Sequence, residues 1–106
     1  MAKYLVKASY TKAGMLGLLK DGGSTRRAVV EGLAESLGGK VEAFYYAFGD
    51  NDIYSIMDYP DNVTVAAASL VVRAAGGVDV SIAVLLTPEE IDAAVQKSVV
   101  YVAPGN

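Results

Sequence analysis

The sequence predicts an α+β fold with a four-stranded antiparallel sheet, helices on one face of the sheet and one more helix at the C-terminus. Two apolar, aromatic runs flank the turn residues Gly49-Asp50-Asn51-Asp52, a pattern typical of a β-hairpin. Helical spacing of apolar residues appears before this hairpin and again after it. A further alternating segment, Val78–Leu86, predicts the fourth strand.

The first strand and its crossover occupy about the first 40 residues. Lys3–Tyr10 alternates between polar and apolar residues, which indicates a half-polar strand. Apolar residues in Thr11–Gly23 predict a short helical segment that the glycines at its end break. Ser24 or Thr25 is expected to cap a second helix, and Gly38-Gly39 ends it. The crossover is therefore one long, broken helical region.

The hairpin, Lys40–Asp58, is apolar on both faces. A strand that is apolar on both sides needs cover on both sides. The period of two leaves open which set of side chains faces the helices. In the first hairpin strand it predicts one set with Val41, Ala43, Tyr45 and Ala47, and another with Glu42, Phe44, Tyr46 and Phe48.

The second half of the chain repeats the pattern of strand end, helix and strand. Pro60 ends the third strand, and Asp61 or Asn62 caps an alanine-rich helix that runs to about Ala75. In Thr87-Pro88-Glu89-Glu90 the residues of a capping box predict a C-terminal helix from Glu89 to about Ser98. The complete order matches the ferredoxin-like split βαββαβ motif.

Composition excludes several kinds of chemistry. The 106 residues predict a single domain, residues 1–106, with a net charge of -3 and no concentrated basic patch for nucleic acid. The absence of cysteine and histidine removes disulfides, thiolate nucleophiles and the usual metal and haem ligands, so we expect no metal and no cofactor. No apolar run reaches the roughly 18 residues of a membrane span, and a cytoplasmic location is the expectation.

The sheet is expected to have one face that its own chain does not cover. Hydrophobic residues make up 53% of the sequence, and the hairpin is aromatic on both faces. Monomers rarely leave such large apolar patches in water. The sequence therefore predicts a homodimer or higher homo-oligomer, in which sheets pair across this face to form a dimeric α/β barrel.

Several short motifs spread along the chain resemble the GYD-domain family, small bacterial and archaeal proteins with the dimeric α/β-barrel fold and no established general function. The resemblance is carried by Tyr4, Tyr10-Thr11, Leu37-Gly38-Gly39-Lys40, Tyr45–Asp52, Pro60-Asp61-Asn62, Leu86–Glu90, Tyr101 and Pro104-Gly105. One position departs from the family. Asn51 stands where the family's Gly-Tyr-Asp turn has tyrosine, so no role of that tyrosine is carried over.

Two candidate binding sites follow from residue type. A cavity between paired sheets would hold a small apolar or aromatic ligand, with tyrosines packing against it and ionisable groups orienting it. Its candidate ligand-binding residues are Lys7, Glu42, Tyr46, Tyr54 and Asp58. Arg26 and Arg27, at the start of the second helix, are candidate anion-binding residues, or they are exposed arginines beside an ordinary helix cap.

The hairpin turn has its own two interpretations. Asp50 and Asp52 suit acid-base chemistry or a hard cation, and they equally suit the capping of backbone amides in a turn. Calcium takes about six oxygen ligands, more than this turn supplies.

Two functions from different classes follow. The first is a homo-oligomeric binding or accessory module with no chemistry of its own. The second is a cofactor-independent enzyme of the monooxygenase or isomerase kind working inside the barrel, a hypothesis that rests on fold analogy. Without histidine, its base would be a buried carboxylate such as Glu42 or Asp58, or a tyrosine, and the sequence identifies no catalytic residue.

Overall fold

The computed structural model describes all of residues 1–106, and eight elements follow one another along the chain. The predicted α+β class and element order are confirmed, with two helices in the first crossover. The elements are β1 (Ala2–Tyr10), α1 (Lys12–Asp21), α2 (Gly23–Ser36), β2 (Lys40–Tyr46), β3 (Ile53–Tyr59), α3 (Asn62–Ala74), β4 (Val78–Leu85) and α4 (Pro88–Val95).

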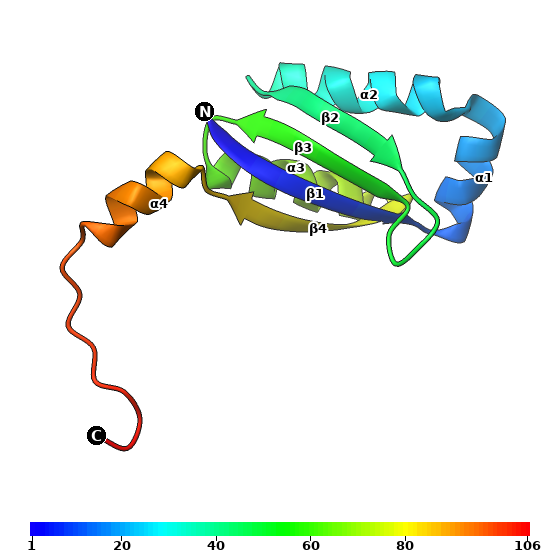
Figure 1. The fold of residues 1–106 in the computed structure, drawn as a ribbon. Coiled ribbons are helices and arrows are strands. Elements are labelled where there is room, and N and C mark those ends of the chain that lie inside the picture. Colours follow the sequence, from blue (N-terminus) through cyan, green and yellow to red (C-terminus); the bar gives the residue numbers. More distant parts are fainter.

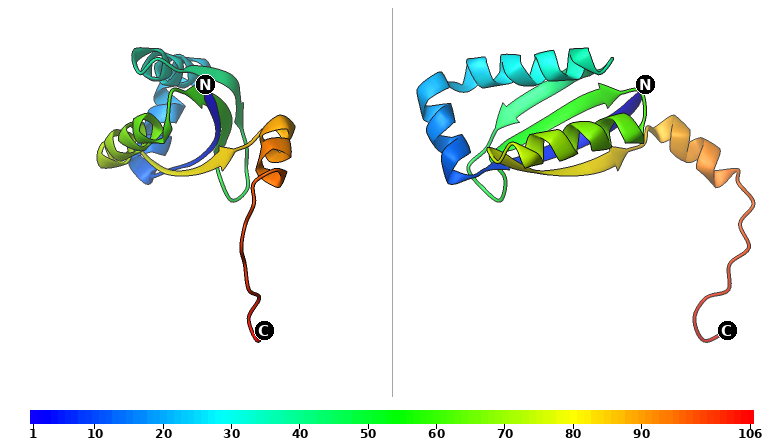
Figure 2. Two further views of the ribbon diagram at one scale, coloured as in Figure 1. Left: turned by 90° about the vertical axis from the view of Figure 1, so that its left-hand side faces the viewer. Right: turned by 180° about the vertical axis from the view of Figure 1, so that it is seen from behind.

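The four strands form one antiparallel sheet in the order β2-β3-β1-β4. The first and third strands lie in the middle, and the second and fourth form the edges, as the ferredoxin-like split motif requires. The sheet curls strongly, with α2 and α3 on its concave side (Figure 2). Both main helices therefore cover the same face, as predicted.

The helices lie over the edges of the sheet rather than over its centre. α2 packs on β2 and α3 packs mainly on β4. α1 lies across one end of the sheet, whereas α4 and the residues after it project away from the body of the protein (Figure 1). This arrangement leaves a trough above the central strands, between α2 and α3.

A close approach of two glycines holds α1 at the end of the sheet. A Cβ on Gly14 would lie only 1.8 Å from the carbonyl oxygen of Gly77, so no larger residue fits without a shift of the backbone. The Thr11 hydroxyl donates to the Gly76 carbonyl at 2.7 Å and accepts from the Gly14 amide at 3.2 Å. The start of α1 is thus tied to the turn between α3 and β4.

The caps differ in how well the sequence predicts them. α2 begins after Gly22, whose φ of 83° suits glycine, and no side chain caps it, so the prediction of Ser24 or Thr25 as the cap was wrong. Asp61 caps α3 as predicted, and its carboxylate accepts from the Thr64 hydroxyl and then from the Thr64 amide, which hold the pKa of Asp61 below its usual 3.8. The predicted capping box at the start of α4 is confirmed.

The α3 helix is apolar around most of its circumference, and a helix of this kind needs cover on more than one side. The single chain does not supply that cover, because Val63, Leu70 and Val71 are all exposed. No helix in the protein is both long enough and apolar enough to cross a membrane.

The core is built from alternate residues of the central strands and from the inner faces of the helices. Tyr4 is fully buried, its hydroxyl donates to Asn62 Oδ1 at 2.7 Å, and its ring meets that of Tyr59 edge-on. Burial raises the pKa of the Tyr59 phenol. Burial, and then the negative charge of Asp61, raise the pKa of the Tyr4 phenol.

A β-bulge at Glu42 changes the alternation along β2. Val41 pairs with Met57, but the next pair is Ala43 with Ile56, so Glu42 is an extra residue. Side chains beyond the bulge therefore change face relative to a regular strand. The prediction that placed Glu42 in one set with Phe44 and Tyr46 was wrong, because strict alternation does not hold across an inserted residue.

Candidate functional site

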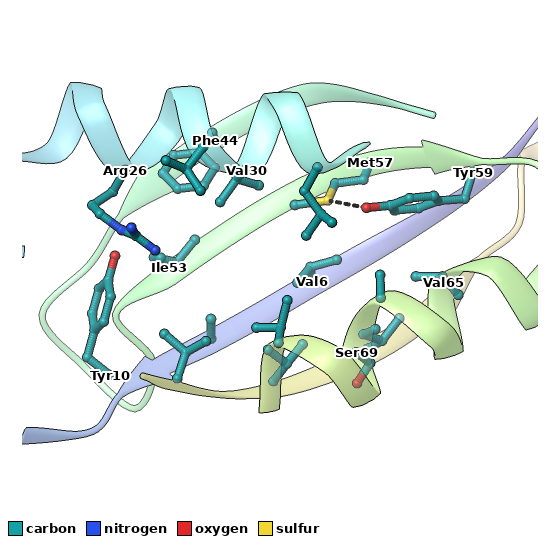
Figure 3. A pocket seen from close by; sticks show the side chains of 18 residues that line it. Val6, Tyr10, Arg26, Val30, Phe44, Ile53, Met57, Tyr59, Val65 and Ser69 are labelled. Atoms are coloured by element: carbon teal, nitrogen blue, oxygen red, sulfur yellow. Dashed lines mark hydrogen bonds between the residues drawn. The ribbon is translucent and has the colours of Figure 1, made fainter. Parts of the chain in front are cut away.

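A cavity of about 140 Å³ lies between the concave face of the sheet and the helices α2 and α3 (Figure 3). All four strands and both helices contribute to its lining. Of its 18 lining residues, 16 are hydrophobic. The cavity therefore lies on the helix side of the sheet, whereas the sequence predicted a ligand space on the opposite side, between paired sheets.

The cavity exists because small side chains line the trough between the two helices. Ala8 on β1 and Ala68 and Ser69 on α3 leave space where larger residues would meet across the trough. Ala8 and Ala68 are themselves buried. The alanine-rich composition of α3 was a visible signal for this site, but the sequence does not show that the alanines face the sheet.

The polar groups of the cavity lie mostly at its ends. At one end, Arg26 from the first turn of α2 and Tyr10 from the end of β1 point toward one another (Figure 3). Toward the other end, the Tyr59 hydroxyl donates to Met57 Sδ at 3.8 Å, a weak hydrogen bond. Arg26 is the single charged residue of the lining.

Tyr46 lies close to the Arg26 end of the cavity, on the helix side of the sheet. Its hydroxyl donates to the Gly23 carbonyl at 3.0 Å, and its ring edge fills the space where a Cβ on Gly23 would lie. Burial, and then the neighbouring Tyr10 phenol, raise the pKa of Tyr46 to about 12. The prediction that Tyr46 faces the space between sheets was wrong, and the bulge at Glu42 is the reason.

The opposite, open face of the sheet carries a network of charges at one end. Lys3 Nζ donates to Asp58 Oδ1 at 3.0 Å and to Glu42 Oε2 at 3.1 Å. These bonds, that to Asp58 first, hold the pKa of Lys3 above its usual 10.5. Asp58 is only 3% exposed, and its Oδ2 has no hydrogen-bond partner within the chain.

The structure brings the predicted ligand-binding residues together only in part. Lys7 lies opposite Tyr54 on the open face, and Asn51 Nδ2 donates to the Tyr54 hydroxyl at 3.3 Å. Lys7 and the Lys3 network are four residues apart along β1, about 13 Å. Glu42 and Asp58 form one group and Lys7 and Tyr54 another, and a ligand-binding role for either group stays a prediction.

The two predicted anion-binding arginines have different surroundings. Arg27 is exposed and lies 3.9 Å from Glu31, one turn further along α2. Arg26 is half-buried, lines the cavity, and belongs to none of the chain's ion pairs. Although the two arginines are consecutive on α2, Arg27 lies at the surface and Arg26 faces the cavity.

Of the two hairpin carboxylates, that of Asp52 contributes to the loop structure. Asp52 Oδ2 accepts from the Tyr10 amide at 2.8 Å, and the Asp52 amide donates to the Ala8 carbonyl at 2.8 Å. The side chain therefore caps the end of β1. No group of three or more carboxylates comes together in the chain.

The lining favours binding over proton transfer at neutral pH. No carboxylate lines the cavity, and the two carboxylates considered as bases, Glu42 and Asp58, lie on the other face of the sheet. A phenol with a pKa of about 12, such as that of Tyr46, stays protonated and is a poor base near pH 7. The cavity offers hydrogen-bond donors, one positive charge and an apolar wall.

Fold and cavity together define the class of protein: a ferredoxin-like α+β domain with an apolar pocket between its sheet and its helices. The GYD-domain family model matches residues 4–95, which is most of the chain. The chain therefore belongs to the GYD-domain family. No curated protein and no solved structure matches it.

Proposed function

We propose that this GYD-family protein is a homo-oligomeric binding module whose cavity, on the helix side of the sheet, holds a small apolar molecule. The observation that carries the proposal is the cavity itself, which is bounded by two helices and a sheet and is lined almost entirely by apolar side chains. Small-molecule sites have this character, with a few polar groups that orient the ligand.

The size of the cavity limits the ligand. An apolar cavity of about 150 Å³ in another protein stays dry and takes up benzene. The cavity here is about 140 Å³, so its occupant is one aromatic ring or an aliphatic body of similar volume.

The open face of the sheet supports self-association. Tyr45 is 72% exposed there, and Leu5, Ile56 and Leu85 are partly exposed elsewhere on the same face. Apolar side chains left exposed on a face that no helix of the chain covers support an interaction surface there.

The C-terminal segment, residues 96–106, points to the same conclusion. It projects away from the body of the protein (Figures 1 and 2). Val99, Val100, Tyr101 and Val102 are between 68% and 99% exposed. Four consecutive apolar residues in water are costly, and a second copy of the chain would cover them.

The cavity proposal is tested by adding benzene to the protein and following the methyl NMR signals of Val6, Val30 and Ile82. Saturable shifts confined to the residues around the cavity are expected. The control is Ala68→Leu, which fills the cavity, removes the shifts and raises the free energy of unfolding by about 1 kcal/mol. Shifts that are absent from the native protein, or equal in the filled variant, would overturn the proposal.

A further inference from the structure

We infer that the ligand of this cavity is a small organic acid, with an apolar body of about one ring and a carboxylate that binds Arg26. The inference rests on the proposed function, because it names the class of molecule that the same cavity takes. It starts from the charge balance of the lining, which has one cation and no anion.

Arg26 has no carboxylate partner within the chain, although its guanidinium is half-buried among apolar side chains. The chain's ion pairs join Lys3 to Glu42, Lys3 to Asp58, and Arg27 to Glu31, and none includes Arg26. A guanidinium that is half-buried beside apolar side chains loses part of its hydration, and a bound anion restores that interaction.

The end of the cavity near Arg26 has the donors that a carboxylate requires. A guanidinium presents parallel N–H groups that match the two oxygens of a carboxylate. The Tyr10 side chain points toward Arg26 and adds a phenolic O–H (Figure 3). The Tyr10 backbone is held in place at the end of β1, because its amide donates to Asp52 Oδ2 at 2.8 Å.

The rest of the cavity selects against a second polar group on the ligand. Beyond the Arg26 end, the lining is apolar except for Ser69, and the Tyr59 hydroxyl already donates to Met57 Sδ. A second charge at that end would be buried without a partner. The ligand is therefore a monocarboxylate of about the size of benzoate or hexanoate rather than a diacid.

The test compares benzoate with benzyl alcohol and benzylamine, which keep the ring and change the charge. Their binding is measured at pH 7 and low salt by the same NMR titration. Benzoate is expected to bind roughly 10- to 100-fold more tightly than benzyl alcohol, as one charge-assisted contact allows, and benzylamine is expected to bind most weakly.

Three variants complete the test. Arg26→Gln should remove the preference for benzoate while benzyl alcohol still binds, and Arg26→Lys should keep part of the preference, because lysine has the charge without the planar fork. Arg27→Gln is the matched control: it removes a neighbouring charge that faces away from the cavity, and it should leave the preference intact.

The outcomes separate the two proposals. If benzene and benzyl alcohol bind but benzoate binds no more tightly, the cavity function stands and the organic-acid inference is overturned. An equal loss of the preference for benzoate in Arg26→Gln and Arg27→Gln would also overturn the inference, because it would show that the preference depends on the protein's net charge and not on a contact with Arg26. If no compound binds the native protein, both proposals fail.

Discussion

The two faces of the sheet share four strands but differ in what covers them. The concave face has α2 and α3 over its edges and holds an apolar cavity between them. The open face has no helix, and it mixes exposed tyrosines with the charged group of Lys3, Glu42 and Asp58. The chain's own helices cover the concave face, and the open face is the one that we propose for self-association.

We expect the two faces of the sheet to have different roles. Side chains on the concave face hold the fold together and leave a space of defined size, so changes there act on stability and on ligand binding. The exposed apolar side chains of the open face make few contacts within the single chain, so we expect changes there to act mainly on the proposed association. Paired substitutions on the two faces test that division.

The largest expected effect comes from the concave face. Tyr4→Ala removes a fully buried ring and its hydrogen bond to Asn62, and it should lower the free energy of unfolding by about 3–5 kcal/mol. Urea unfolding at a fixed protein concentration measures the change. The comparison is Tyr45→Ala on the open face, which should cost under about 1 kcal/mol. Equal costs at the two positions would contradict the division.

A smaller effect, on association, is expected from the open face. Tyr45→Asp places a charge in the proposed subunit contact and should weaken self-association at least about tenfold, or 1.4 kcal/mol. Sedimentation equilibrium measures the dissociation constant. Leu19→Asp is the control, because Leu19 is also exposed and apolar but lies on α1, away from this face. A native protein that is monomeric at micromolar concentration would refute the contact altogether.

The smallest effect concerns the charges of the open face. Asp58 and Glu42 raise the pKa of Lys3 in the folded protein above 10.5. The ion pairs of Lys3 with these two carboxylates therefore stabilise the protein fully below pH 10.5. This stabilisation is lost as the pH rises through the raised pKa. The loss should be small, since the Lys3 side chain is 39% exposed.

Unfolding curves of the native protein and of Lys3→Met between pH 9 and 12 measure this contribution by their difference, because tyrosine ionisation is common to both proteins. The stability difference between the two proteins should shrink as the pH rises. A difference that stays constant over this range would show that the Lys3 pair adds nothing through its charge.

Most of the fold could be predicted from local patterns. Turn residues at Gly49–Asp52, the cap at Asp61 and the capping box at Thr87 each act through nearby backbone groups, so the sequence reveals them. The start of α2 was missed because it depends on the positive φ of Gly22 rather than on a side-chain cap. The close contact of Gly14 with Gly77 is also invisible to local reading, since it joins distant parts of the chain.

The candidate site was harder to predict than the fold. Arg26 was singled out for anion binding, and the structure places it in the cavity, but nothing local distinguishes it from Arg27. The cavity depends on which residues of β1, β3 and α3 face one another across the trough. This arrangement depends on packing between segments that are distant in the sequence. In the sequence itself, its only sign is the high alanine content of α3.

The inserted residue at Glu42 has a consequence for comparing this protein with its relatives. Upstream of it, odd-numbered positions of β2 face inward, and downstream the even-numbered ones do, as Val41 and Phe44 show. A relative that lacks this one residue would have a regular strand here, with the counterparts of Phe44 and Tyr46 still facing inward and that of Tyr45 outward, because the bulge takes up the extra residue without changing the pairs beyond it. An alignment to such a relative that runs from the start of β2 without a gap would therefore match residues that face the helices with residues that face the open side of the sheet.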